Sequence, residues 1–261
     1  MAGKQKNFQG IVLKKTKLGE SDLIITFLAQ DGSRVQGVAK GARKPQSSFS
    51  ARLELFSSVE VFCSETKGLP IIQEVRLQCS YEHLRVDYDL MACASAVAEF
   101  LYKAVQEDLP VQRLYDCVAM YFSVLQECPL QLAPALTAAA LLKCFALLGL
   151  RPSFTHCVAC EDEAVSSCEE QLAFSYVEGG VLCDSCKSFQ DYVSYDKQSL
   201  LWLHALLMST FRDIAALKVP MGASYFGLQL CQEWGRQHLG VNVKSIPILL
   251  TTFGYDLKES E

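Results

Sequence analysis

The chain has 261 residues, of which 50% are hydrophobic and 20% are charged. This composition excludes a wholly disordered, collagen-like or low-complexity protein. The net charge of −5 argues against a nucleic-acid partner, but the charges are unevenly distributed. Residues 1–76 contain 12 Lys and Arg against 7 Asp and Glu, whereas residues 77–261 contain 12 against 22. The asymmetry indicates that the N-terminal part binds a polyanion.

Residues 1–78 have the pattern of short strands. Apolar residues alternate with others at 23–28, 34–40 and 58–63, and the runs 8–18 and 71–77 complete the set. Asp31-Gly32 lies between two of these runs and is typical of a hairpin turn. Five short strands in about 75 residues predict a small barrel or meander.

From residue 79 onward the apolar residues recur at helical spacing. We expect helices at 87–108, from Pro110, from about 132 to a stop at Gly149, from an N-cap at Asp196, and a last one around 226–234. The chain is thus divided into a strand-rich part at 1–78, a helical part at 79–153 and 195–261, and an interruption at 154–194.

The apolar run at 130–150 is long enough to raise the question of a membrane span. It has Lys143 near its centre, where a charge is costly in lipid. We therefore expect a buried core helix and no membrane partner. The polar, lysine-rich start of the chain lacks the apolar segment of a secretory signal, so we expect a cytoplasmic protein whose 12 cysteines are reduced.

The interruption contains two Cys-x-x-Cys pairs, Cys157/Cys160 and Cys183/Cys186, separated by 22 residues. This spacing is typical of a zinc site, because each tight turn points two thiolates at one ion. Gly179-Gly180 is expected to form a hairpin before the second pair. Four cysteine ligands leave no open position for water, so we predict one structural zinc per chain. The alternatives are ordinary thiols, a redox pair, or replacement of one ligand by His156 or Cys168.

Basic residues cluster in the strand-rich part. Arg34 and Lys40 share one face of a strand, and a flexible basic loop follows at 41–45. We predict that a phosphate backbone is bound by Lys14, Lys15, Lys17, Arg34, Lys40, Arg43, Lys44 and Arg52. Phe8, Phe49 and Phe56 are candidates for stacking on bases, although each one taken alone is expected to belong to the core.

The sequence contains no nucleotide-binding glycine pattern and no metalloprotease motif, and we predict that the protein is not an enzyme. Three other interpretations remain open at this point. They are an RNA-binding or ribosome-associated factor with a zinc site, a protein-interaction adaptor, and a zinc-dependent hydrolase, which the all-cysteine site disfavours.

The order of motifs along the whole chain resembles the bacterial recombination-mediator family RecO. The motifs are Gly10-Ile11-Val12-Leu13, Gly19-Glu20-Ser21-Asp22, Val38-Ala39-Lys40-Gly41-Ala42-Arg43-Lys44, Leu55-Phe56, Gly68-Leu69-Pro70, Leu147-Leu148-Gly149-Leu150-Arg151-Pro152 and the two cysteine pairs with Gly179-Gly180. The last 65 residues match only as generic helices.

The resemblance implies an α+β multidomain fold, with a five-stranded oligonucleotide/oligosaccharide-binding (OB) barrel, an α-helical domain and an inserted four-cysteine zinc module. It implies binding of single- and double-stranded DNA, strand annealing, and action with RecR and single-strand-binding protein (SSB). It also implies loading of RecA onto SSB-coated DNA in recombinational repair, at the bacterial nucleoid.

Overall fold

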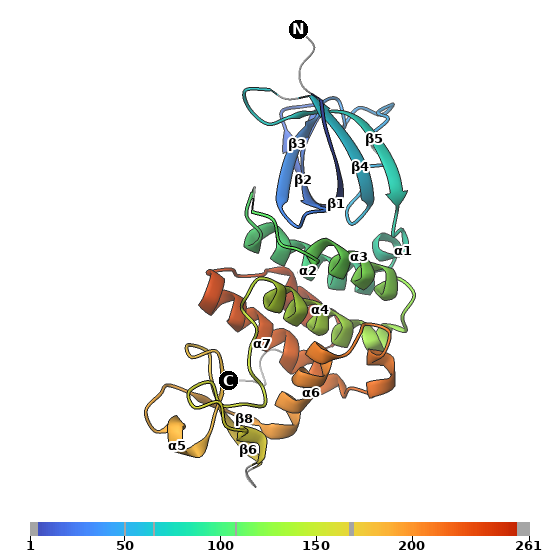
Figure 1. Ribbon diagram of the computed structural model, residues 1–261. Helices are drawn as coiled ribbons and strands as arrows, with labels where there is room; N and C mark the ends of the chain where they lie inside the picture. The colour runs from blue at the N-terminus through green and yellow to red at the C-terminus, as the bar shows by residue number, and fades with distance from the viewer. Residues whose placement is uncertain (1–4, 50, 65, 108, 167–169, 255–261) are drawn as a thin grey trace. The chain divides into compact units, whose positions relative to one another are not determined.

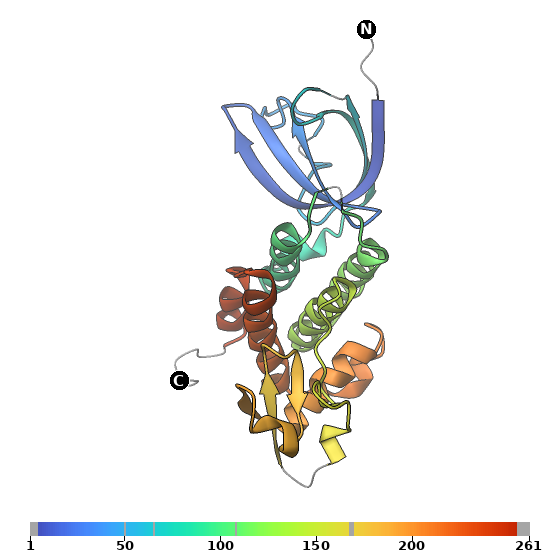
Figure 2. The ribbon, with the colours of Figure 1, turned by 60° about the vertical axis from the view of Figure 1, so that its left-hand side comes forward.

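The computed structural model describes residues 5–49, 51–64, 66–107, 109–166 and 170–254 (Figures 1 and 2). The chain forms two compact units, Met1–Glu127 and Cys128–Glu261. The first unit contains a β-barrel followed by helices, and the second contains helices and a small sheet. The domain boundaries expected after residues 78, 153 and 194 stay a prediction.

The barrel confirms the strands expected at the N-terminal end of the chain. Its five strands close in the order β1-β2-β3-β5-β4, which is the OB fold. They are β1 (Gln5–Leu18), β2 (Asp22–Ala29), β3 (Arg34–Ala39), β4 (Ser58–Ser64) and β5 (Ile71–Cys79). Pairing is antiparallel except between β3 and β5, which run parallel where Val38 meets Ile71.

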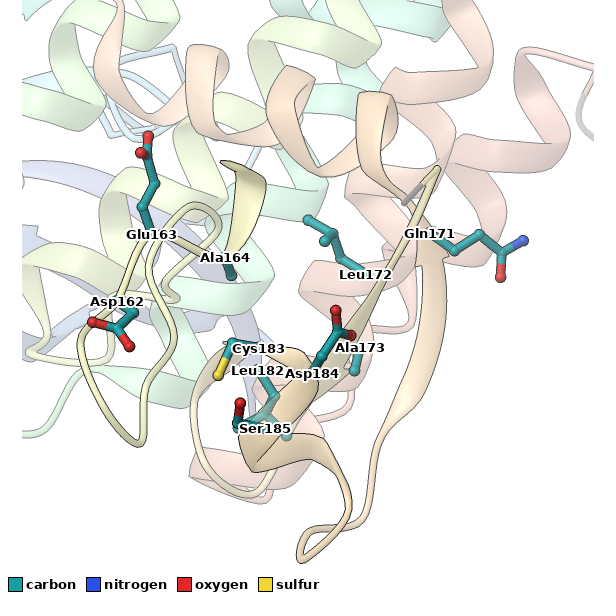
Figure 3. A pocket seen from close by; sticks show the side chains of 10 residues that line it. All are labelled: Asp162, Glu163, Ala164, Gln171, Leu172, Ala173, Leu182, Cys183, Asp184 and Ser185. Carbon is teal, nitrogen blue, oxygen red and sulfur yellow. The ribbon is translucent and has the colours of Figure 1, made fainter. Parts of the chain in front are cut away.

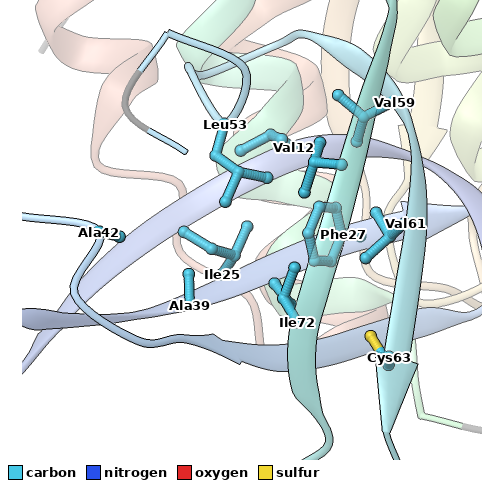
Figure 4. Packing of buried hydrophobic residues seen from close by; sticks show 11 residues of the cluster. Val12, Ile25, Phe27, Ala39, Ala42, Leu53, Val59, Val61, Cys63 and Ile72 are labelled. Carbon is cyan, nitrogen blue, oxygen red and sulfur yellow. The ribbon is translucent and has the colours of Figure 1, made fainter. Parts of the chain in front are cut away.

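The interior of the barrel is filled by side chains from all five strands and from the β3–β4 loop (Figure 4). The members are Val12, Ile25, Phe27, Ala39, Ala42, Leu53, Val59, Val61, Cys63, Ile72 and Val75. Ala42 lies in the 41–45 stretch that was expected to be a flexible loop, and Leu53 lies further along the same β3–β4 connection. This connection contains turns, in one of which Leu53 N donates to Phe49 O at 2.9 Å. Its buried residues hold its basic residues in place at the surface.

The helices of the first unit are α1 (His83–Val86), α2 (Tyr88–Ala104) and α3 (Leu114–Leu125). The helix expected from Pro110 begins only at Leu114, and the segment before Pro110 pairs with the barrel, where Arg34 N donates to Gln106 O at 3.0 Å. The Asp31-Gly32 turn is confirmed, and it packs so closely here that a Cβ on Gly32 would lie 2.0 Å from Val111 O.

The second unit is built on α4 (Ala133–Leu147), which packs against α6 (Lys197–Met208) and α7 (Met221–Leu239). The expected N-cap is confirmed, since the Asp196 carboxylate accepts from Ser199 N at 2.7 Å. Helix α7 is followed by α8 (Ser245–Thr252), so the helix around 226–234 is not the last one. Short 3-10 turns occur at Leu130–Leu132, Ala164–Ser166 and Ile214–Leu217.

The apolar segment Leu130–Leu147 is the one helical stretch in the described residues that is long and apolar enough to cross a membrane. Of this segment, 67% is buried inside the structure. Lys143 Nζ donates to Leu207 O at 2.6 Å, so the charge in the middle of α4 has a polar partner within the second unit. These features are those of a core helix.

The four-cysteine segment forms a small antiparallel sheet in the order β7-β6-β8, with β6 (Gln171–Ser175), β7 (Gly180–Leu182) and β8 (Val193–Asp196). The glycine hairpin expected between β6 and β7 is present, and a Cβ on Gly180 would lie 2.3 Å from Ser153 O. A single turn of helix, α5 (Asp184–Lys187), carries the second cysteine pair.

Aromatic side chains attach this sheet to α7. Phe174 lies 5.8 Å from Trp234, and Tyr195 lies 4.8 Å from Phe226, measured between ring centroids. Trp234 Nε1 also donates to Leu150 O at 3.0 Å. Figure 2 shows the sheet beside α7. The segment therefore shares its hydrophobic core with the helices and does not depend on a metal alone for its packing.

Candidate nucleic-acid interface and metal centre

The four predicted metal ligands come together. The Sγ atoms of Cys157, Cys160, Cys183 and Cys186 all lie within 4.8 Å of one another. Cys160 Sγ and Cys183 Sγ, one from each pair, are 3.6 Å apart. Tetrahedral zinc bonded to four sulfurs at about 2.3 Å requires sulfur–sulfur distances of about 3.8 Å. The spacing of the sulfurs is thus compatible with a zinc ion.

Each cysteine pair lies on a tight turn that is closed by a backbone hydrogen bond. In the first turn Glu161 N donates to Cys157 O at 2.9 Å, and Glu161 has a φ of 66°. In the second, Cys186 N donates to Cys183 O at 3.0 Å. A bond from Val158 N to Val181 O at 3.0 Å joins the two turns. The local backbone of these turns therefore brings the four sulfurs together.

The sulfurs compete for protons, as expected of thiols that share one small space. Burial raises the pKa of the Cys157 thiol, but the backbone N–H groups of Cys183, Ala159 and Cys160 stabilise its thiolate, and the net pKa falls to about 6. The Asp162 N–H lowers the pKa of Cys160, but desolvation and hydrogen bonds to Cys157 and Cys183 act in the opposite direction, and the net pKa rises to about 12. A divalent cation that replaces the shared protons would remove this conflict.

The other candidate ligands do not join the cluster in the described residues. His156 Nδ1 is 2.9 Å from Thr155 Oγ1, and this histidine is not among the grouped side chains. Cys168 lies outside the described residues. All four positions of the cluster are cysteine, which is the donor set of a structural site.

The surroundings of the cysteines are acidic. A cavity of about 230 Å³ beside Cys183 is lined by Asp162, Glu163 and Asp184, among other residues (Figure 3). Residues 154–194 contain eight Asp and Glu against a single Lys. A surface of this charge repels phosphate groups.

The predicted phosphate-binding residues fall into separate groups on the barrel. Four of them surround the β1–β2 turn: Lys17, Lys40, Arg43 and Lys44, all of them exposed. Lys17 is in register with Leu23, which is in register with Ala39, so Lys17 and the end of β3 are neighbours. Arg43 N donates to Ser21 O at 2.9 Å. We call these four residues the loop-end cluster.

The loop-end cluster is organised by one carboxylate. Asp22 accepts from Gly41 N at 2.8 Å and from Ser21 Oγ at 2.8 Å. The Gly41 hydrogen bond, then the Ser21 bond and the charges of Lys40 and Lys44, lower the pKa of Asp22 below its usual 3.8. Asp22 therefore stays ionised and fixes the two loops to each other.

Arg34 begins β3, at the far end of that strand from the loop-end cluster, and Lys14 lies within β1 in register with Thr26 of β2; both side chains contact Tyr102 of α2. Lys14 Nζ lies 3.8 Å from the centroid of the Tyr102 ring, and Arg34 Nη1 donates to Tyr102 O at 2.9 Å. Lys40 was expected to share a strand face with Arg34, but β3 ends at Ala39 and Lys40 lies in the turn that follows it. Basic residues thus lie on β1, at the start of β3 and in the turns after β3, whereas β2 has none.

The remaining two predicted residues already have protein partners. Lys15 Nζ forms an ion pair with Glu54 at 3.0 Å, and Arg52 Nη1 donates to Val75 O at 3.3 Å. Among the aromatic candidates, Phe56 is 1% exposed and lies 5.4 Å from Phe122 of α3, so it is a core residue. Phe8 and Phe49 are half-buried against the barrel core.

The structure also brings in two residues that sequence reasoning missed. Tyr102 reaches the basic face from α2, and no periodicity relates it to the strands. Lys67 is exposed in the β4–β5 loop, which ends where Val38 N donates to Pro70 O at 2.8 Å. In OB folds the strand 2–3 face and the loops between strands 1–2 and 4–5 bind oligonucleotides. Only the barrel topology, which could not be derived from spacing alone, places Lys67 beside β3.

Comparison with known proteins agrees with this fold. The family described as "Recombination protein O N terminal" matches residues 1–81, and "Recombination protein O C terminal" matches residues 85–247. The chain belongs to the RecO family. The RecO matches span both the barrel and the helical unit with its four cysteines.

Individual relatives cover most of the chain. The DNA repair protein RecO of Desulfatibacillum aliphaticivorans is 29% identical over 250 residues, covering 92% of this chain and 94% of the relative. RecO of Symbiobacterium thermophilum is 32% identical over 180 residues, covering 69% and 70%. RecO of Bifidobacterium adolescentis is 27% identical over 244 residues, covering 92% and 97%. The family is one of DNA repair proteins.

Proposed function

We propose that this RecO-family protein binds single- and double-stranded DNA along the outer face of β1–β3 and anneals complementary strands. The observation that carries the proposal is the placement of basic residues along this face. The loop-end cluster lies at one end of β3 and Arg34 at the other, and the side chain of Lys14 lies with Arg34 at Tyr102. The face coincides with the ligand-binding surface typical of OB folds.

Annealing on this face needs no chemical step. Basic residues neutralise phosphates on two strands and lower their mutual repulsion, while base pairing supplies the sequence specificity. The loop-end cluster supports this role because its four side chains are exposed. Their carboxylate neighbour, Asp22, is held by hydrogen bonds from Gly41 and Ser21. The acidic four-cysteine segment excludes DNA from that part of the second unit.

The proposal includes the partners and the metal that the family resemblance implies. The protein acts with RecR and SSB, and helps to load RecA onto SSB-coated DNA in the bacterial cytoplasm, at the nucleoid. One structural zinc is held by Cys157, Cys160, Cys183 and Cys186, whose sulfurs are close enough together to share an ion. The zinc stabilises the turns of the small sheet and takes no part in catalysis.

The test is annealing of complementary strands that have been coated with SSB. Lys40→Glu/Lys44→Glu reverses two exposed charges of the loop-end cluster, and Arg212→Glu/Lys218→Glu makes the same charge change at exposed positions of the second unit. We expect the first variant to anneal at least about tenfold more slowly than the second, since phosphate contacts dominate the affinity. Equal rates would refute the proposed face. A preference for structured RNA over single-stranded DNA in a competition experiment would favour the RNA-binding alternative.

A further inference from the structure

Three side chains from three different elements meet where α2 contacts the barrel. Lys14 comes from β1, Arg34 from β3 and Tyr102 from the last turn of α2. Lys14 Nζ lies 3.8 Å from the Tyr102 ring centroid, and Arg34 Cζ lies 5.8 Å from it. A cation held against an aromatic ring keeps hydrogen-bond donors that point away from the ring.

Arg34 has a carboxylate partner, whereas Lys14 has none among the described residues. Arg34 Nη2 lies 3.4 Å from Glu107 Oε1, and its Nη1 bonds to the backbone of Tyr102, so Arg34 holds α2 against β3. Lys14 has no carboxylate partner among the residues that the structure describes. Its neighbour along the strand, Lys15, has one in Glu54. Lys14 is therefore the ammonium group available for an external anion.

The Tyr102 hydroxyl lies close to the positive charges of Lys14 and Arg34. A hydrogen bond with Lys14 is the largest cause that lowers the pKa of Tyr102, and the charges of Lys14, Arg34 and Lys103 act in the same direction. The side chain is only partly buried. A neutral hydroxyl beside an ammonium group that has no carboxylate partner among the described residues can donate hydrogen bonds to one phosphate together with that ammonium group.

We propose that Lys14 Nζ and the Tyr102 hydroxyl form a binding site for a single backbone phosphate of the DNA strand that runs along β1–β3. This inference rests on the proposed function and extends it, because the bound strand then contacts α2 as well as the barrel. Arg34 is a positioning residue that fixes the last turn of α2. The bound DNA strand would then run from the loop-end cluster to this phosphate site.

The test is fluorescence anisotropy of a labelled single-stranded oligonucleotide, titrated at several salt concentrations. We expect Tyr102→Phe to weaken binding about threefold to tenfold, since it removes one hydrogen bond to a charged group. We expect Lys14→Gln to reduce the slope of log affinity against log salt by about 0.7, the value for one contact to a single strand. The double variant is expected to lose less than the sum of the two single losses.

Two matched controls separate binding from folding. Tyr88→Phe removes the hydroxyl of an exposed tyrosine at the first turn of the same helix, and Lys218→Gln removes an exposed lysine of the second unit. Both are expected to bind as the wild type does. Wild-type affinity and slope in Tyr102→Phe and Lys14→Gln, with weakened binding in Lys40→Glu/Lys44→Glu, would overturn this inference alone. Absence of salt-dependent binding by the wild type would overturn the proposed function and this inference together.

Discussion

Arg43 Nη1 donates to the carbonyl oxygen of Glu20 at 2.8 Å and also to that of Gly19 at 3.1 Å. The contact joins the β3–β4 loop to the β1–β2 turn, and Asp22 makes a second connection through Gly41 N. Arg43 therefore supports the loop-end cluster with its side chain, while Lys40 and Lys44 remain available for phosphate. Variants of Lys40 and Lys44 test binding without disturbing this connection.

The Asp22 connection predicts a dependence of stability on pH. Since hydrogen bonds lower the pKa of Asp22 below 3.8 in the folded protein, its contribution is fully present above about pH 4 and is lost as the pH falls through the lowered pKa. We expect Asp22→Asn to lower the free energy of unfolding at pH 7. The difference from the wild type should shrink below pH 3.8. Urea titrations across this range measure it.

Glu20→Gln is the control for the Asp22 experiment, because it removes a neighbouring charge in the same turn. That variant is expected to follow the wild type across the range. A difference between wild type and Asp22→Asn that stays constant down to pH 2 would show that the carboxylate does not hold the loops in its ionised form.

Phe56 is predicted to act in folding and not in DNA binding. It is 1% exposed and contacts Phe122, so Phe56→Ala should lower the free energy of unfolding by about 3–5 kcal/mol. Phe189→Ala, at a position 84% exposed, should change it by less than about 0.5 kcal/mol. Urea denaturation measures both. A Phe56→Leu variant that keeps its stability but loses affinity for DNA would instead make Phe56 a base contact.

At the metal site, the effect of losing a zinc ligand can be measured apart from the effect of losing side-chain packing. Cys160 is exposed, so Cys160→Ala removes little packing but one of four ligands. We expect native mass spectrometry to find one zinc ion in the reduced wild type and in Cys128→Ala, and none in Cys160→Ala. A chelator should lower the thermal midpoint of the first two proteins only. Reduced wild type without zinc, after expression in zinc-supplemented medium, would exclude the site.

The sequence predicted those parts of the fold that depend on local pattern. Alternation located β2, β3 and β4, the less regular runs at 8–18 and 71–77 located β1 and β5, and the helix capped by Asp196 begins as expected. The start of α3 was misplaced: Val111 lies against Gly32 of the barrel, and this long-range contact could not be derived from the sequence pattern. The helix α8 was missed because its eight residues are too few to establish a clear period.

At the candidate sites too, features set by local spacing could be predicted, whereas features set by long-range contacts could not. The four cysteines could be predicted, since their ligand geometry is set by spacing within each turn. The basic residues could be identified by type but not sorted, because partners such as Glu54 for Lys15 are 39 positions away in the chain. Tyr102 could not be found at all, since only the packing of α2 against β1 brings its ring to Lys14.

The central claim is that the outer face of the barrel binds the phosphate backbone of DNA. The most direct measurement is the affinity of a labelled single-stranded oligonucleotide as a function of salt concentration, for the wild type, Lys40→Glu/Lys44→Glu and Arg212→Glu/Lys218→Glu. The account predicts that the loop-end variant loses at least about tenfold in affinity, and about 1.4 in the log–log salt slope for two lost contacts. The control variant should keep the wild-type slope. If both variants lose affinity equally, the protein binds DNA through its overall charge or another surface, and the account is wrong.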